Sequence, residues 1–213
     1  MLGQVALSVR KHWQKKSKCL SKKIIKNYKM ARAESNEFLI GKIAPDFNLI
    51  NTVDNSFVSL SSAKGSVGTV IMFICNHCPF VIHVNPELIK MANEFQEKGI
   101  RFIAISSNEI INYPQDAPKF MKEVAEDLKY PFPYLFDETQ EVAKAYDAAC
   151  TPDFYVFDKD LKAVYHGQLD DSRPGNGESL TGKDIRAAIH NLLDNKPVLE
   201  NQKPSVGCGI KWK

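Results

Sequence analysis

The sequence VIMFICNHCPFVIH, residues 70–83, places two cysteines three positions apart where an apolar run ends. The β-branched and apolar residues before Cys75 are typical of a buried central strand. From about Phe80 the apolar positions recur at helical spacing, and Gly99 ends the pattern. Two thiols at such a strand-to-helix junction are compatible with a redox dithiol, with half of a metal site, or with a coincidence of composition.

The CxxC motif has a clear chemical use at the start of a helix. There the unpaired N–H groups and the helix dipole favour a thiolate, so we expect Cys75 to have a low pKa and to attack a disulfide. Cys78, expected one helical turn further on, would then attack the mixed disulfide and release the product. His77 lies between them and, when protonated, would favour the thiolate further, which predicts a more oxidising pair than one with a neutral residue there.

A metal site is the main alternative for the cysteine pair. A structural zinc ion needs four ligands, and the chain has no second CxxC and no paired histidine motif. Cys150, Cys208 and His83 could complete such a site only if folding brought them together. A c-type haem is disfavoured because Pro79, rather than histidine, follows Cys78. We therefore predict no metal and no organic cofactor.

The whole chain has the composition of a folded domain with an extension. It has 213 residues, 44% of them hydrophobic, and no run of about 18 apolar residues that could span a membrane. Its five cysteines are too few for a secreted disulfide scaffold, which indicates a reducing compartment. We expect an intracellular and most simply cytoplasmic location.

Positive charge is concentrated in an N-terminal extension, residues 1–33. This extension holds ten Lys and Arg residues and no acid, so it carries +10 and, since the chain carries +3, leaves −7 on the remainder. Three interpretations stay open: a solvated tail, an organellar import signal, or a segment that binds acidic membrane or nucleic-acid surfaces. Because the body is acidic, we expect it to have no nucleic-acid partner.

Apolar patterns along the body alternate between strands and helices. This order predicts parallel strands joined by crossover helices, followed by an antiparallel hairpin. We predict an α/β fold with a central mixed sheet flanked by helices on both faces, a domain over residues 34–196 and a C-terminal tail over 197–213. The expected strands are 43–62 (two short strands), 69–74, 100–107, 134–137 and 151–169 (a hairpin), and the expected helices are 80–98, 115–128, 138–146 and 181–196, the last with Thr181 as its N-cap.

Several motifs together resemble one known family. They are APDF (44–47), CNHCPF (75–80), CTPDFYVFD (150–158), GQLDDSRPGNG (167–177) and GCGIKWK (207–213). With them the chain resembles the thioredoxin-like, peroxiredoxin-like proteins of the alkyl hydroperoxide reductase and thiol-specific antioxidant (AhpC/TSA) superfamily, over about residues 36–213. The resemblance implies a thioredoxin-like fold and redox activity.

The resemblance also assigns roles to particular residues. Thr151 and Pro152 match the cis-proline position of the thioredoxin fold, which would face the dithiol and hold an extended substrate backbone. Cys78 matches the peroxidatic cysteine of peroxiredoxins. A peroxiredoxin has threonine three residues before that cysteine, where this chain has Cys75, and no match to the active-site arginine is evident.

Our prediction is a thiol–disulfide oxidoreductase in which Cys75, Cys78 and Pro152 are catalytic and His77 and Thr151 modulate them. Its substrate would be a protein or small-molecule disulfide, and its electrons would come from another dithiol protein or a small thiol. We expect a role in antioxidant defence or redox homeostasis. The alternatives are a thiol peroxidase that uses Cys78 and a non-catalytic binding module with the same fold.

Two further cysteines are candidate accessory thiols. Cys150 precedes the proline by two positions, and we favour a buried core cysteine over a third redox thiol. Cys208 lies between two glycines, and we expect either an exposed thiol that resolves an intermediate or a tail cysteine without a role. The sequence does not define the oligomeric state.

Overall fold

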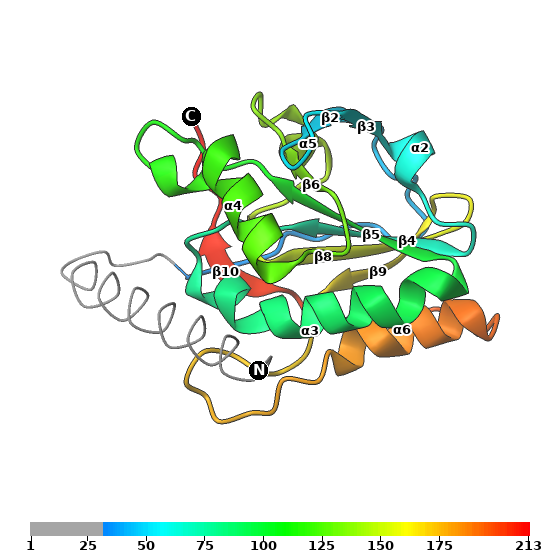
Figure 1. Cartoon of the computed structure of the whole chain (residues 1–213). Helices are drawn as coiled ribbons and strands as arrows, with labels where there is room; N and C mark the ends of the chain where they lie inside the picture. The colour runs from blue at the N-terminus through cyan, green and yellow to red at the C-terminus, as the bar shows by residue number, and fades with distance from the viewer. Residues whose placement is uncertain (1–31) are drawn as a thin grey trace, which may run out of the picture. The chain divides into compact units, whose positions relative to one another are not determined.

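Strand β4, Gly68–Phe73, is the centre of the fold in the computed structural model, which describes residues 32–213 (Figure 1). All six of its residues are buried. Because successive side chains of a strand point to opposite faces, Val70 and Met72 pack into one core while Ile71 and Phe73 pack into another. A strand covered on both faces explains the uninterrupted apolar run in the sequence.

The parallel half of the sheet grows from one side of β4. β4 pairs in parallel with β5 (Ile100–Ser106), and β5 pairs in parallel with β6 (Tyr134–Phe136). Parallel neighbours need crossover connections, and helices α3 (Pro79–Phe95) and α4 (Pro118–Leu128) supply them. This half of the fold was predicted from the alternation of strand and helix patterns.

Antiparallel strands complete the seven-stranded sheet. On the other side of β4 lies the predicted hairpin, and next to β6 lie the two short strands that the sequence also predicted. The resulting order is β3-β2-β6-β5-β4-β8-β9. Their bounds are β8 (Asp153–Asp158), β9 (Ala163–Gly167), β2 (Asn48–Asn51) and β3 (Phe57–Ser59).

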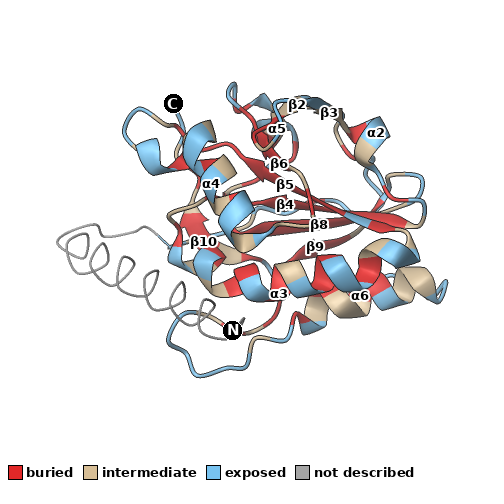
Figure 2. Cartoon of the chain, viewed as in Figure 1, coloured by how far each residue is buried: buried red, intermediate tan, exposed pale blue. Residues whose placement is uncertain are grey.

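Helices cover both faces of this sheet, as predicted. α3 and α6 (Lys183–Leu193) lie together along one face, and their buried residues belong to the same core as those of α4 (Figures 1 and 2). α2 (Leu60–Ala63) and α5 (Glu141–Ala145) contribute to the core on the other face. Two 3-10 turns, Gln96–Lys98 and Pro114–Asp116, complete the described helices.

A second, three-stranded sheet contains the C-terminal segment. Strand β10 (Val206–Gly209) pairs antiparallel with β1 (Arg32–Glu34) on one side and with β7 (Cys150–Thr151) on the other. The sequence predicted an extended tail here but not its pairing. β10 therefore lies directly beside the residues that precede Pro152.

The start of α6 differs from the prediction. Its N-cap is Gly182, with a φ of 65°, and not Thr181. The carboxylate of Asp170, from the start of the loop that joins β9 to α6, accepts hydrogen bonds of 2.6 Å from the backbone N–H groups of both Thr181 and Gly182. A tertiary contact thus replaces the local cap that the sequence suggested.

Among residues 32–213, no helix is both long and apolar enough to cross a membrane. Residues 1–31, which include Cys19 and all but the last two residues of the basic extension, lie outside the described residues.

Candidate active site

The cysteine pair lies where β4 gives way to α3. Cys78 is the N-cap of α3 and Pro79 is its first residue, while Cys75 lies in the connection before the helix. We expected Cys75 at the helix terminus and Cys78 one turn further in. The structure corrects this placement: proline fits the first helical position because it lacks an N–H and has a fixed φ, so the helix begins at Pro79.

Three sulfur atoms and one threonine converge at this junction. The Sγ of Cys78 lies 2.9 Å from the Sγ of Cys208 and 3.1 Å from the carbonyl oxygen of Thr151. The Sγ of Cys75 lies 3.3 Å from the hydroxyl of Thr151. All three cysteines are buried free thiols. The close pair expected from the sequence is therefore part of a larger cluster.

The environment of Cys78 favours its thiolate. Burial alone would raise the pKa of Cys78, but its contacts with the thiols of Cys208 and Cys75 and with the backbone at Val81 and Cys208 outweigh burial and lower it to about 2. A protonated Cys78 could instead donate to the Thr151 carbonyl. The N-terminus of α3 and the two neighbouring thiols favour the anion, so the pKa of Cys78 lies below that of an ordinary cysteine.

The pKa values of the two neighbouring thiols are shifted in the opposite direction. The pKa of Cys75 is raised by burial, by its hydrogen bond to Cys78 and by the charge of Asp116. The pKa of Cys208 is raised by its hydrogen bond to Cys78 and by burial. The pKa shifts therefore favour Cys78 over Cys75 and Cys208 as the thiolate of this cluster.

Cys208 is buried, which corrects the expectation of an exposed tail thiol. It is only 2% exposed. Its strand, β10, places it opposite Thr151 in the antiparallel register, so pairing with β7 brings its side chain to the dithiol. The GCG sequence contains no apolar alternation that could have signalled this strand.

The proline predicted to face the dithiol is in a cis peptide. The bond between Thr151 and Pro152 is cis, as the resemblance implied. Cys150, two residues before Pro152, is fully buried, and its Sγ lies 3.7 Å from the Pro152 carbonyl oxygen. Burial raises the pKa of Cys150, as in a core cysteine.

A buried carboxylate that the sequence did not single out organises the motif. Asp116, with no exposed surface, accepts hydrogen bonds from the Asn76 N–H at 2.8 Å and from the Asn108 side chain at 2.8 Å. Its Oδ2 also lies 2.6 Å from the Nδ1 of His77, whose ring stacks on Tyr113. No local sequence pattern identifies Asp116, because it lies far from the CxxC motif in the sequence and contacts it only in the folded structure.

One cluster of the described residues has the atom types of a metal site. Its potential ligand atoms lie within 4.8 Å of one another and belong to Cys75, His77 and Asp116. The fit to a metal is poor, since His77 and Asp116 already bond each other and Asp116 has two further donors. A structural zinc site also requires four ligands. His83, considered above as a ligand with Cys150 and Cys208, instead bonds the hydroxyl of Ser172 at 2.8 Å.

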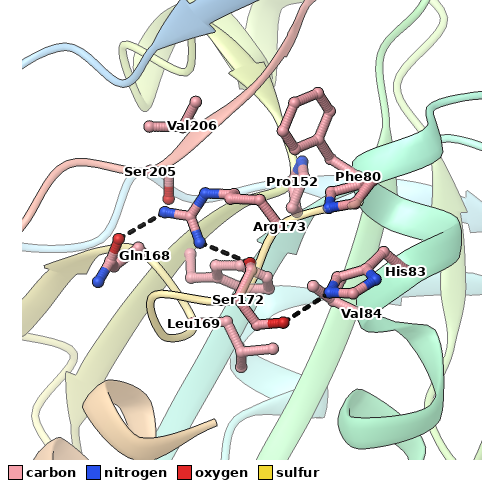
Figure 3. A pocket seen from close by; sticks show the side chains of 12 residues that line it. Phe80, His83, Val84, Pro152, Gln168, Leu169, Ser172, Arg173, Ser205 and Val206 are labelled. Atoms are coloured by element: carbon pink, nitrogen blue, oxygen red, sulfur yellow. Dashed lines mark hydrogen bonds between the residues drawn. The ribbon is translucent and has the colours of Figure 1, made fainter. Parts of the chain in front are cut away.

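A pocket opens next to the proline (Figure 3). Pro152, Phe80 of α3 and Val206 of β10 line one part of it, and the His83–Ser172 pair and Arg173 line another. Arg173 is held by hydrogen bonds of 2.5 Å and 2.7 Å to the carbonyl oxygens of Asp170 and Ser172. The pocket reaches Pro152, and Val206 of β10 forms part of its wall.

The strand order, the cis-proline and the CxxC at the helix start define a protein of the thioredoxin-like class. The family comparison narrows this class, because residues 40–166 match the AhpC/TSA family. The chain belongs to the AhpC/TSA family. Membership places it in a general class of redox proteins.

Solved structures agree with this assignment. An uncharacterized conserved protein from Geobacillus kaustophilus is 62% identical, covers 87% of this chain and 98% of its own, and has a TM-score of 0.86. A hypothetical protein from Sinorhizobium meliloti is 42% identical over 84% of this chain and 98% of its own, with a TM-score of 0.82. The search of curated proteins gave no match.

More distant structures show the same fold. The thioredoxin domain of a thiol-disulfide oxidoreductase from Bacteroides vulgatus is 20% identical over 74% of this chain and 99% of its own, with a TM-score of 0.58. At this identity the likeness supports the thioredoxin-like fold, which the sequence predicted.

Proposed function

We propose that the protein is a thiol–disulfide oxidoreductase in which Cys78 is the attacking thiolate and Cys75 the resolving thiol. The observation that carries this proposal is the position of Cys78 as the N-cap of α3, with its sulfur 2.9 Å from the sulfur of Cys208. A stabilised thiolate is the nucleophile of disulfide exchange. This assignment reverses the roles that the sequence suggested for the two cysteines.

The exchange proceeds in two steps. The Cys78 thiolate attacks a substrate disulfide, forms a mixed disulfide and releases one substrate thiolate, which takes a proton from solvent. The Cys75 sulfur then loses its proton and attacks the Cys78 sulfur, which releases the second substrate thiolate and leaves a Cys75–Cys78 disulfide. The substrate is reduced by two electrons and the dithiol is oxidised by two; an external thiol or dithiol protein restores it.

The stabilised thiolate also supports an oxidising potential. Interactions that stabilise the reduced form of a dithiol make its disulfide a stronger oxidant. The Cys78 thiolate is stabilised in this way, so we infer that the Cys75–Cys78 disulfide is readily reduced. Pro152 and Thr151 position the extended backbone of a protein substrate next to the sulfurs.

A thiol peroxidase that uses Cys78 is the competing function, and its support is the low pKa of the same sulfur. A peroxidase also needs groups that polarise the peroxide. Among residues 32–213, the groups bonded to the Cys78 sulfur are thiols, backbone N–H groups and one carbonyl, with no cationic side chain. We therefore place disulfide exchange first. We also propose a role in redox homeostasis.

The test is a redox titration combined with turnover. The chain with Cys19 replaced by serine would be equilibrated in glutathione buffers, and intact mass after thiol labelling would report the disulfides. We expect a reversible Cys75–Cys78 disulfide, and reduction of a disulfide-bonded model peptide that is lost in Cys78→Ser. Peroxide turnover without peptide reduction would favour the peroxidase. A binding module would show neither activity, and would keep its partner complex with both cysteines changed to serine.

A further inference from the structure

Strand β10 occupies the edge of β7 beside Pro152. In the antiparallel register, Cys208 lies opposite Thr151 and Gly209 opposite Cys150. Addition of an extended segment to an exposed strand edge is a common way of binding peptides. The position that the proposed function assigns to a substrate backbone is thus filled by the chain's own C-terminal segment.

The sequence of β10 permits an unusually close approach to this edge. A Cβ atom added at Gly207 would lie 1.9 Å from the carbonyl oxygen of Thr151 and 3.1 Å from the nitrogen of Pro152. A Cβ atom added at Gly209, on the other side of Cys208, would meet nothing closer than 3.8 Å. Glycine at 207 is therefore required for docking, whereas glycine at 209 is not.

Docking of β10 brings the third sulfur against Cys78. The 2.9 Å between the Cys78 and Cys208 sulfurs is within about 1 Å of a disulfide bond length of about 2.04 Å. Cys78 itself has no exposed surface. β10 contributes to this burial through Cys208, so we expect movement of β10 to expose Cys78 and its return to bring a thiol back to the same sulfur.

We propose that Cys208 is a third redox thiol, which forms a disulfide with Cys78, and that β10 acts as the chain's internal substrate strand. This inference rests on the proposed function and adds a second partner for Cys78. β10 leaves β7 when a disulfide substrate binds, and it redocks after Cys78 has formed the mixed disulfide.

The chemistry of the relay balances. After the Cys78 thiolate has attacked the substrate disulfide, Cys208 loses its proton to solvent and attacks the Cys78 sulfur. The bond between Cys78 and the substrate breaks, the substrate thiolate leaves and takes up a proton, and a Cys78–Cys208 disulfide forms. Cys75 then loses its proton, attacks the Cys78 sulfur and displaces the Cys208 thiolate, which is reprotonated.

The direct test is the variant Cys75→Ser, made together with Cys19→Ser and oxidised with glutathione disulfide. We expect the intact mass to show the loss of two hydrogen atoms and peptide mapping to find residues 78 and 208 cross-linked. The control, which carries Cys208→Ser as well, would show a mixed disulfide with glutathione instead. If Cys75→Ser also gives only the glutathione adduct, the relay is overturned.

The two proposals fail in different ways. A parent chain that forms Cys75–Cys78 and reduces the model peptide, but whose Cys75→Ser variant forms no bond to Cys208, retains the proposed function without the relay. A parent chain in which residues 78 and 208 are cross-linked, with no bond between 75 and 78 at any potential, retains Cys208 as the redox partner of Cys78 and overturns the proposed Cys75–Cys78 dithiol.

The glycine pair tests the docking of β10 separately. We expect Gly207→Ala to increase the rate of alkylation of Cys78 in the reduced protein by about tenfold or more, because the added methyl group overlaps the backbone of Thr151. Gly209→Ala should change that rate by less than about twofold, since ordinary contact distances are retained. Equal rates in the parent and both variants would overturn docking as the cover of Cys78. Should Gly207→Ala not fold, the Cys75→Ser experiment still decides the proposal.

Discussion

At the scale of single residues, the Cys78 sulfur is distinguished from its neighbours by its position at the N-terminus of α3, in contact with Cys208 and Thr151. The spacing of the CxxC motif predicted a close pair of thiols, and Pro79 held the information that would have placed Cys78 at the helix cap. The other contributors could not be predicted. Cys208 and Asp116 reach the motif only through tertiary structure.

Cys208 should control the acidity of Cys78. We expect Cys208→Ala to raise the pKa of Cys78 by about one to two units, since a hydrogen bond to a charged group is worth about 1.5–3 kcal/mol. Cys208→Ser retains a donor and should raise it less. The measurement is a pH titration followed by the NMR shift of the labelled Cys78 Cβ, and an unchanged titration in Cys208→Ala would contradict the assigned donor.

His77 should make the dithiol more oxidising. Its ring pairs with Asp116, whose charge acts on Cys75 in the same site, so removal of His77 leaves more unbalanced negative charge beside the dithiol and disfavours the Cys78 thiolate. We expect His77→Pro to lower the reduction potential by tens of millivolts, where about 30 mV corresponds to 1.4 kcal/mol.

His77→Ala controls for the backbone effect of proline, and both variants should shift in the same direction. A glutathione titration in which neither is more reducing than the parent would reject this role for His77.

At the scale of elements, periodicity predicted those strands and helices whose pattern is set by a core. β4 is buried on both faces, and α3 and α6 each bury one face against the sheet. β10 could not be predicted, because two of its four residues are glycine and its pairing with β1 and β7 is non-local. The predicted start of α6 was wrong for a related reason, since Asp170, which binds the N–H groups before the helix, lies beyond the range of a local capping motif.

Asp170 should therefore matter more to stability than its neighbour Asp171. Asp170→Ala leaves the N–H groups of Thr181 and Gly182 without their acceptor and should lower the free energy of unfolding by about 1–3 kcal/mol. Asp171 forms surface ion pairs with Lys183 and Lys203, and Asp171→Ala should cost less than about 1 kcal/mol. Urea unfolding of both variants provides the comparison. Equal losses of unfolding free energy would argue against the stabilising role of the hydrogen bonds to Asp170.

At the scale of the whole molecule, the mixed sheet and the helices on both faces were predicted because strand and helix patterns alternate through most of the chain. What the sequence did not predict is the closure of the active site by the C-terminal segment. β10 belongs to a second sheet that joins both ends of the described chain to the segment before Pro152. The redox site is thus built from three distant parts of the sequence: the CxxC motif, the segment before Pro152 and β10.

The stability of the reduced protein should depend on pH through Cys78. Its folded pKa of about 2 lies far below the value of about 8.5 for an unfolded cysteine. Between these values the unfolded chain binds a proton that the folded chain does not, so the stabilisation is present above the unfolded pKa and is lost as pH falls. Relative to Cys78→Ala, the reduced parent should lose up to about 1.4 kcal/mol per pH unit on acidification.

Above the unfolded pKa the sign reverses, because Cys75 and Cys208 have raised pKa values and the unfolded chain then releases protons that the folded chain retains. Denaturant unfolding of the reduced parent and of Cys78→Ala, from pH 5 to 8 in steps of about one unit, measures the difference directly. Parallel pH profiles for the two proteins would show that the folded Cys78 is an ordinary thiol, and the assignment of the attacking sulfur would then have to be abandoned.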